Sequence, residues 1–116
     1  MSSVPLNTST QIKLDGSGNG TAKIGPIVGQ RWDLSVAAVS ITNAVLIPLC
    51  SVYMGGSPTP DNFVDGTYTG SFDSTDRVQG LPITNGQYCW AVWSGGDPNA
   101  IATLSITGSQ ETQYKK

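Results

Sequence analysis

The segment 86–108 constrains the fold of this chain more than any other. It contains two runs of aromatic and β-branched residues, 87–94 and 99–107, which flank the turn residues Gly95-Gly96-Asp97-Pro98. Two strand-like runs on either side of a turn are typical of a β-hairpin. Large apolar side chains occupy both faces of the first run, as in a strand at the middle of a sheet. The segment therefore predicts a hairpin whose first strand is central.

Strand-like runs recur along the rest of the chain. The runs 11–14 and 21–24 flank a glycine-rich turn and predict a second hairpin. Alternation in the long run 31–42 changes phase at Ala37-Ala38, which indicates a β-bulge or a strand that crosses between sheets. A helix over residues 35–46 is the alternative, but the β-branched residues in this run favour a strand.

Together these runs predict an all-β fold. Spacing of about ten residues between strands, with turns between them, is typical of a single antiparallel β-sandwich, Ig-like or jelly-roll, of about seven or eight strands. Pro48 places its part of the strand 46–54 at an edge or a bulge. The irregular segment 57–79 is expected to carry a short strand near 64–69 or to lie along the edge of the sandwich.

Domain limits and a core follow from the same pattern. Residues 1–10 are polar and predict an N-terminal arm, residues 11–108 form the β-sandwich domain, and residues 109–116 form a C-terminal tail. A chain of 116 residues is long enough for one domain with a core of its own. The residues that we expect in this core are Trp32, Val52, Trp90, Leu104 and Ile106.

Composition excludes several classes of function. Charged residues make up only 12% of the chain, the net charge is −2, and the six basic residues form no cluster beyond the terminal pair, so we expect no nucleic-acid partner. The chain contains no histidine, which excludes Ser-His-Asp and Cys-His catalysis and every His-ligated metal site. The longest apolar run, 44–50, is too short to span a bilayer.

The two cysteines are expected to be reduced. Residues 1–5 have neither the basic start nor the apolar run of a signal peptide, so we expect the protein to stay in the cytoplasm in which it is made. Cys50 and Cys89 would then be buried thiols. A disulfide between them is the alternative, if their strands face each other.

Acidic and aromatic residues offer two further candidate sites. Asp61, Asp65, Asp73 and Asp76 lie within sixteen residues, and such a concentration could bind calcium. Their spacing fits no EF-hand, so we prefer the interpretation that each initiates a turn, and we expect no cofactor and no enzymatic activity. Tyr68, Tyr88, Trp90 and Trp93 are the candidate rings for stacking on a sugar, with Trp93 and Tyr68 preferred, although a tryptophan inside a strand is more often part of the core.

Four stretches carry a resemblance to a known family. They are Arg31-Trp32, Pro48-x-Cys50-x-Val52-Tyr53-x-Gly55, Asp65-Gly66-Thr67-Tyr68-Thr69-Gly70-Ser71-x-Asp73, and Val92-Trp93-Ser94-Gly95-Gly96-Asp97-Pro98-x-Ala100. Over residues 11–108 the chain resembles small proteins encoded among the virion genes of tailed phages that infect actinobacteria. The resemblance implies a virion component of the capsid or the tail, and it brings no catalytic residues with it.

We therefore expect a non-enzymatic structural protein of a phage particle, a capsid decoration or minor tail component that is assembled in the host cytoplasm and binds the major capsid or tail protein. A carbohydrate-binding module that recognises host glycans is the alternative. The strands 45–54 and 87–94 carry no charge to guard a sheet edge, so we also expect a homo-oligomer, a trimer before a dimer. Val4, Pro5 and Leu6 of the arm would contact a neighbouring subunit or the shell.

Overall fold

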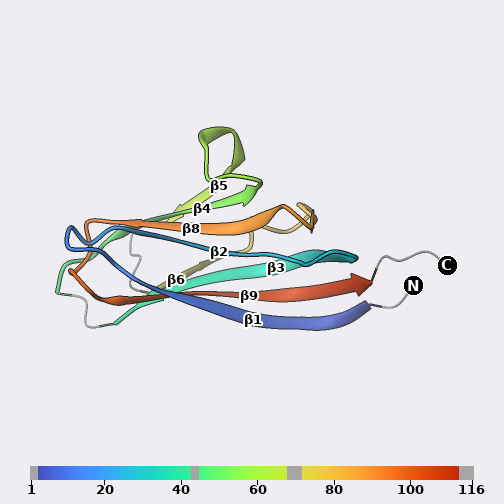
Figure 1. Ribbon diagram of the computed structural model, residues 1–116, viewed down its shortest axis with the longest axis horizontal. Helices are drawn as coiled ribbons and strands as arrows, with labels where there is room; N and C mark the ends of the chain where they lie inside the picture. Colours follow the sequence, from blue (N-terminus) through green and yellow to red (C-terminus); the bar gives the residue numbers. More distant parts are fainter. Residues whose placement is uncertain (1–2, 43–44, 68–71, 113–116) are drawn as a thin grey trace.

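The computed structural model describes residues 3–42, 45–67 and 72–112 of the chain. They form two antiparallel sheets that pack face to face, which confirms the expected β-sandwich (Figure 1). Sheet A contains β1 (Ser3–Lys13), β9 (Ile101–Thr112), β3 (Gln30–Ile41), β6 (Phe72–Thr75) and β7 (Ile83–Thr84). Sheet B contains β2 (Gly20–Ile24), β8 (Tyr88–Ser94), β4 (Leu49–Gly55) and β5 (Phe63–Thr67). The helical part of these residues is one 3-10 turn, η1 (Pro60–Asn62).

The strands pair in a nested order along the chain. β1 pairs with β9, β2 with β8, β3 with both β6 and β7, and β4 with β5. Two further ladders, β3 with β9 and β4 with β8, join these pairs into the two sheets. Because β6 and β7 lie along the same edge of β3, they count as one interrupted strand. The result is the eight-stranded jelly roll with its two Greek keys, rather than an Ig-like sandwich.

Both expected hairpins are wrong. β1 and β2 lie in different sheets, as do β8 and β9, and no ladder joins either pair among the described residues. The connections 14–19 and 95–100 instead carry the chain across the sandwich. Each has six residues, which at roughly 3.3 Å per residue easily spans the ~10 Å between packed sheets. Turn residues between two strands look the same in a sequence whether the chain folds back within a sheet or crosses to the other one.

The two crossing connections pack against each other. The amide of Gly96 donates a hydrogen bond to the carbonyl of Gly18, with an N···O distance of 3.0 Å. Gly18 has a φ of +77°, and a Cβ there would overlap the carbonyl of Gly96. The Asp15 carboxylate accepts hydrogen bonds from the amides of Asn19 and Ser17, and these bonds lower the pKa of Asp15. The backbones of the two connections therefore touch directly, with no room for a side chain at Gly18.

A bulge divides β3, as the phase change in the sequence predicted. The register against β9 shifts between Leu34 and Val36, which leaves Ser35 as the extra residue. The break thus lies two residues earlier than expected. The strand interpretation of this run is confirmed for residues 35–41, and residues 43–44 lie outside the described part of the chain.

The core is built from the inner faces of both sheets. Trp32, Val52, Leu104 and Ile106 are buried as expected. Trp90 is not, because β8 turns its other face inward: Cys89, Ala91 and Trp93 are buried, and Trp90 lies half-buried on the outside. Because both faces of β8 carry apolar residues, the sequence did not show which face points into the core. Its central position is confirmed, since β8 lies between β2 and β4.

The expected domain limits are too narrow at both ends. Residues 3–10 are not an arm, because all of them pair with β9 as part of β1. Residues 109–112, which were expected to belong to a tail, continue β9 and pair with β3. The strand expected near 64–69 is β5, at the edge of sheet B. Pro48 is buried just before β4 begins at Leu49.

Both cysteines are buried, and no disulfide joins them. Cys50 and Cys89 lie on the neighbouring strands β4 and β8, but their register partners are Trp93 and Met54, so they do not lie opposite each other. Burial raises the pKa of Cys89 to about 12. This thiol is therefore protonated at any physiological pH.

Candidate functional site: an aromatic face, a pocket and an apolar loop

Four rings and one lysine gather on the outer side of sheet B, and we call this group the aromatic face. Its members are Lys23 of β2, Tyr88 and Trp90 of β8, Tyr53 of β4 and Phe63 of β5. They come together by strand register, because Trp90 pairs with Lys23 on one side and with Tyr53 on the other, and Tyr53 pairs with Phe63. Opposite residues of an antiparallel pair point to the same side of a sheet, so the row runs across all four strands.

The rings contact one another edge to face. The centroids of Tyr88 and Trp90 lie 5.5 Å apart at an interplanar angle of 76°, and those of Tyr53 and Phe63 lie 5.8 Å apart at 77°. The Lys23 ammonium lies 4.5 Å from the Tyr88 centroid and 5.3 Å from that of Trp90. These are the geometries that the ring quadrupole favours.

Contacts with the backbone fix the positions of the Trp90 and Tyr88 rings. The Trp90 indole donates a hydrogen bond from Nε1 to the carbonyl of Gly55, at 3.0 Å. A Cβ on Gly25 would lie only 2.7 Å from Cδ1 of Tyr88, so the position of the Tyr88 ring depends on a glycine there. The face is thus a preformed surface rather than a set of loose side chains.

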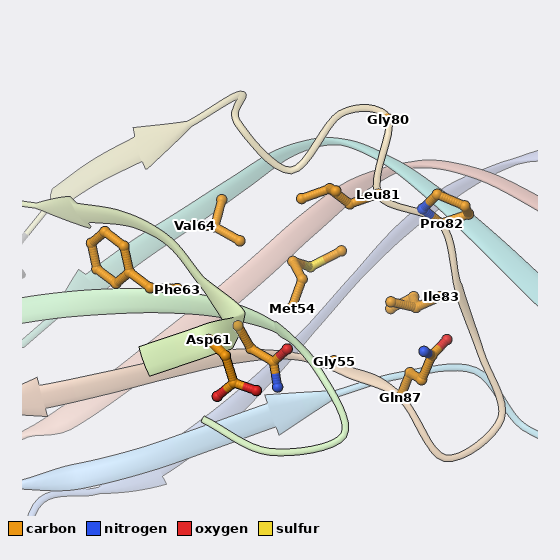
Figure 2. A pocket seen from close by; sticks show the side chains of 11 residues that line it. Met54, Gly55, Asp61, Phe63, Val64, Gly80, Leu81, Pro82, Ile83 and Gln87 are labelled. Atoms are coloured by element: carbon orange, nitrogen blue, oxygen red, sulfur yellow. The ribbon is translucent and has the colours of Figure 1, made fainter. Parts of the chain in front are cut away.

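A pocket with a volume of about 350 Å³ adjoins the aromatic face (Figure 2). Phe63 belongs to both, and Gly55 lies in the pocket wall while its carbonyl holds Trp90. Apolar side chains form most of the lining: Met54, Phe63, Val64, Leu81, Pro82 and Ile83. Polar and apolar atoms contribute about equally to the exposed wall of the pocket, and its size is that of a site for a small ligand or for one unit of a larger one.

Three polar side chains lie around the pocket. Asp61 accepts a hydrogen bond from the hydroxyl of Thr59 at 2.6 Å, which lowers the pKa of Asp61. Asn62 donates from Nδ2 to the carbonyl of Ser57 at 2.9 Å, and the Gln87 carbonyl oxygen accepts from the Thr84 amide at 3.0 Å. Each side chain keeps further capacity for hydrogen bonds, because a carboxylate accepts several and each amide has an NH₂ with two donors.

A separate feature, which we call the apolar loop, occupies the end of the sandwich where β3 passes into β4. Val45, Leu46, Ile47 and Leu49 are exposed there, Val45 to 88%. The carboxylate of Asp97, in the connection between β8 and β9, accepts the amide of Val45 at 2.6 Å through Oδ2 and that of Leu46 at 2.9 Å through Oδ1. One side chain thus holds the aliphatic residues outward in a defined conformation.

The structure brings together only some of the residues predicted as sites from the sequence: Trp90 and Tyr88 belong to the aromatic face, and Asp61 lines the pocket. Trp93 is 0% exposed and belongs to the core, so it cannot contact a glycan, and Tyr68 lies outside the described residues. Val4 and Pro5 are exposed and Leu6 is half-buried, all in β1 at the edge of sheet A.

The four aspartates do not converge on a common point in the described structure. Asp61 accepts the Thr59 hydroxyl, whereas Asp65 and Asp73 accept the amides of the residues that follow them, at 2.9 and 2.8 Å. Asp65 also lies 3.9 Å from Arg77. Across the described ranges, no group of three or more His, Cys, Asp or Glu side chains could hold a metal ion.

Sequence reasoning found part of the aromatic face and missed the apolar loop, for different reasons. Trp90 and Tyr88 were candidate sugar-stacking rings, but Tyr53, Phe63 and Lys23 were not. Trp90, Tyr53 and Lys23 share a side of one sheet only because of a strand order that the sequence did not give. The aliphatic run 45–47 was visible in the sequence, but it was assigned to a strand, where such residues would be buried. Asp97 was noticed only as a turn residue.

Comparison with known proteins leaves the function to be argued from the structure. No protein-family model, curated protein or solved structure matches this chain. In the part of the chain that the structure describes, no helix has the length and apolar character needed to cross a bilayer.

Proposed function

We propose that this chain is a non-enzymatic structural protein of a phage particle, which docks on the major capsid or tail protein through its apolar loop and decorates or stabilises the particle. The observation that carries the proposal is the outward display of Val45, Leu46, Ile47 and Leu49 on a fixed backbone. Contiguous exposed apolar residues mark interaction sites in soluble proteins, because water disfavours them.

The way in which the loop is held supports docking. A flexible apolar loop would lose conformational entropy on binding, whereas a loop already fixed by Asp97 loses less. The loop also extends from a sandwich that supplies a rigid base. Asp97 and Pro48, which is buried beneath the loop, both belong to the stretches that resemble actinobacteriophage virion proteins.

The fold is compatible with this function without deciding it. Jelly rolls occur in viral capsid proteins and also in lectins, and a fold by itself does not establish a function. The low share of charged residues, 12%, suits a module that covers part of its surface against a larger assembly.

Reconstitution tests the proposal. Particles of the phage that encodes this chain, prepared without its gene, are mixed with the recombinant protein and sedimented. The wild type is expected to co-sediment, and Leu46→Asp/Ile47→Asp to stay in the supernatant, because two charges would be placed in the contact. Ile27→Asp/Val28→Asp is the matched control, since these exposed aliphatic residues lie in the turn at the other end of β3. Equal binding of all three proteins would reject docking through the apolar loop.

A second candidate function, binding of host surface glycans, is favoured by the aromatic face and the pocket beside it. Rings stack on the C–H faces of sugars, and the side chains of Asp61, Asn62 and Gln87 offer hydrogen-bond partners for hydroxyl groups next to Phe63. A decoration protein could serve both functions, because the apolar loop and the pocket use different residues.

Titration with oligosaccharides released from the host cell wall tests this candidate. Phe63→Ala removes the ring shared by the face and the pocket, and it is expected to weaken binding by about tenfold if the ring stacks on a sugar. Leu46→Ala is the control, because it changes a comparably exposed apolar residue of the apolar loop. Absence of saturable binding to the wild type would eliminate the second function and leave the first intact.

A further inference from the structure

β1 has one free edge along its whole length. Its eleven residues, Ser3–Lys13, each pair with a residue of β9, and within the described chain no strand pairs with its other side (Figure 1). The outward peptide groups of this strand are therefore open to another strand. The only charged residue in β1 is Lys13, at its end.

The other edges of the molecule are short or guarded. β2 and β5 have five residues each and carry Lys23 and Asp65, and the edge formed by β6 and β7 has four and two residues. β5 is also distorted by a register shift against β4. Short strands, charges and irregularities are the usual means by which proteins prevent pairing at an edge. β1 has Pro5 near one end and Lys13 at the other, which leaves the stretch from Leu6 to Ile12 unguarded.

The strands first expected to drive self-association do not provide such an edge. The uncharged segments 45–54 and 87–94 contain most of β4 and all of β8, and each of these strands has a partner on both sides. Any association by strand pairing must therefore use an outer strand, and β1 is more than twice as long as the other edge strands.

We propose that β1 pairs with β1 of a second copy of this chain, so that two A sheets join into one continuous antiparallel sheet. The partner is a second copy because the strand complements itself. The register that pairs all eleven residues is centred on Thr8, and it places Val4 opposite Ile12 and Asn7 opposite Ser9. Lys13 then lies opposite Ser3, so no like charges meet.

This pairing closes on itself. An edge that binds the same edge of another copy forms an isologous interface with a twofold axis, so the structure favours a dimer over the trimer expected from the sequence. It assigns a role to Val4, Pro5 and Leu6, which lie in the contact as strand residues rather than as an arm. The inference is independent of the proposed docking function, because it uses only the free edge of β1.

Sedimentation of charge variants tests the inference. The wild type is expected to be a dimer at tens of micromolar. Asn7→Lys/Ser9→Lys places lysine opposite lysine twice in the proposed register, and the dissociation constant should rise at least about tenfold, since like charges directly opposite each other oppose strand pairing. Thr107→Lys/Ser105→Lys is the matched control: these residues pair with Asn7 and Ser9 on the interior strand β9, and the dimer should survive.

Mixing two variants distinguishes a lost contact from a lost fold. Asn7→Asp/Ser9→Asp should also be monomeric alone, and an equimolar mixture with the lysine variant should restore a dimer that contains one chain of each. A wild type that sediments as a monomer at these concentrations would overturn the inference. So would a dimer that survives in the lysine variant, because it must then use another surface.

Discussion

At the scale of single residues, Asp97 holds the start of the apolar loop in place. Its two carboxylate oxygens accept the amides of Val45 and Leu46, which precede β4 by a few residues but lie about fifty residues away along the chain. The aliphatic side chains are therefore presented by a carboxylate that contributes no apolar contact of its own. Their presentation depends on a residue that a search for apolar motifs would pass over.

Replacing Asp97 with alanine should free the apolar loop while leaving the sandwich folded. Loss of two hydrogen bonds to a charged acceptor should lower the free energy of unfolding by about 1–3 kcal/mol, as measured by urea denaturation. Amide hydrogens of Val45 and Leu46 should exchange faster. Asp76→Ala is the control, since Asp76 is exposed and its side chain has no hydrogen bond to another described residue. Unchanged exchange in Asp97→Ala would show that the loop is held by something else.

Cys89 makes the free energy of unfolding depend on pH in the alkaline range. The pKa of this thiol is about 12 in the folded protein, against 9.0 when exposed, because burial disfavours the thiolate. Between these two pKa values only the unfolded chain releases the thiol proton. The stabilising contribution of Cys89 to the folded state is therefore complete below pH 9 and is lost as the pH rises toward 12. In this pH range the free energy of unfolding should fall by up to about 1.4 kcal/mol per pH unit.

Unfolding by urea at a series of pH values measures this dependence. The informative quantity is the difference in the free energy of unfolding between the wild type and Cys89→Ala, because this difference isolates the effect of the thiol. The stability of the wild type should fall more steeply above pH 9 than that of the variant. Parallel curves would mean that Cys89 does not titrate differently in the folded and unfolded states.

At the scale of elements, strands could be predicted from the sequence but their partners could not. Alternation and β-branched residues located most of the strands, and the phase change in 31–42 revealed the bulge of β3. Residues 3–10 were not predicted as a strand because their polar side chains suggested an arm, although Val4 and Leu6 alternate with polar residues. The crossings after β1 and β8 were predicted as hairpins, because local turn residues carry no information about which sheet the chain enters next.

The inward phase of β8 can be tested with its two tryptophans. Trp93→Ala should cost about 3–5 kcal/mol of stability, as for a large core side chain. Trp90→Ala should cost only about 1–2 kcal/mol, from a half-buried ring and one hydrogen bond to the Gly55 carbonyl. Thermal or urea unfolding of both variants gives the comparison. The opposite ranking would mean that Trp90, as the sequence first suggested, faces the core.

The packing of the two crossing connections can be tested with two glycines in one loop. Gly18→Ala should lower stability by about 2 kcal/mol or more, because it adds a left-handed backbone penalty to an overlap with the carbonyl of Gly96. Gly16→Ala is the matched control, since a Cβ there meets no atom within 4 Å, and it should stay within about 0.5 kcal/mol of the wild type. Equal effects would show that the two connections do not touch.

At the scale of the whole molecule, the jelly roll separates three surfaces. The apolar loop lies at one end, and the aromatic face covers the outside of sheet B with a pocket beside it. The free edge of β1 borders sheet A (Figure 1). The aromatic face and the free edge of β1 depend on strand order, which could not be predicted from the sequence, whereas the apolar loop depends on its contact with Asp97. Our account assigns docking to the first, a candidate glycan site to the second and self-association to the third.

Electron cryomicroscopy of the purified phage particle tests the central claim, docking through the apolar loop, most directly. The account predicts density for the jelly roll on the capsid or tail, with the loop from Val45 to Leu49 against the underlying protein and Asp97 directly behind it. A particle without this protein would contradict the account. So would a bound jelly roll whose apolar loop faces the solvent.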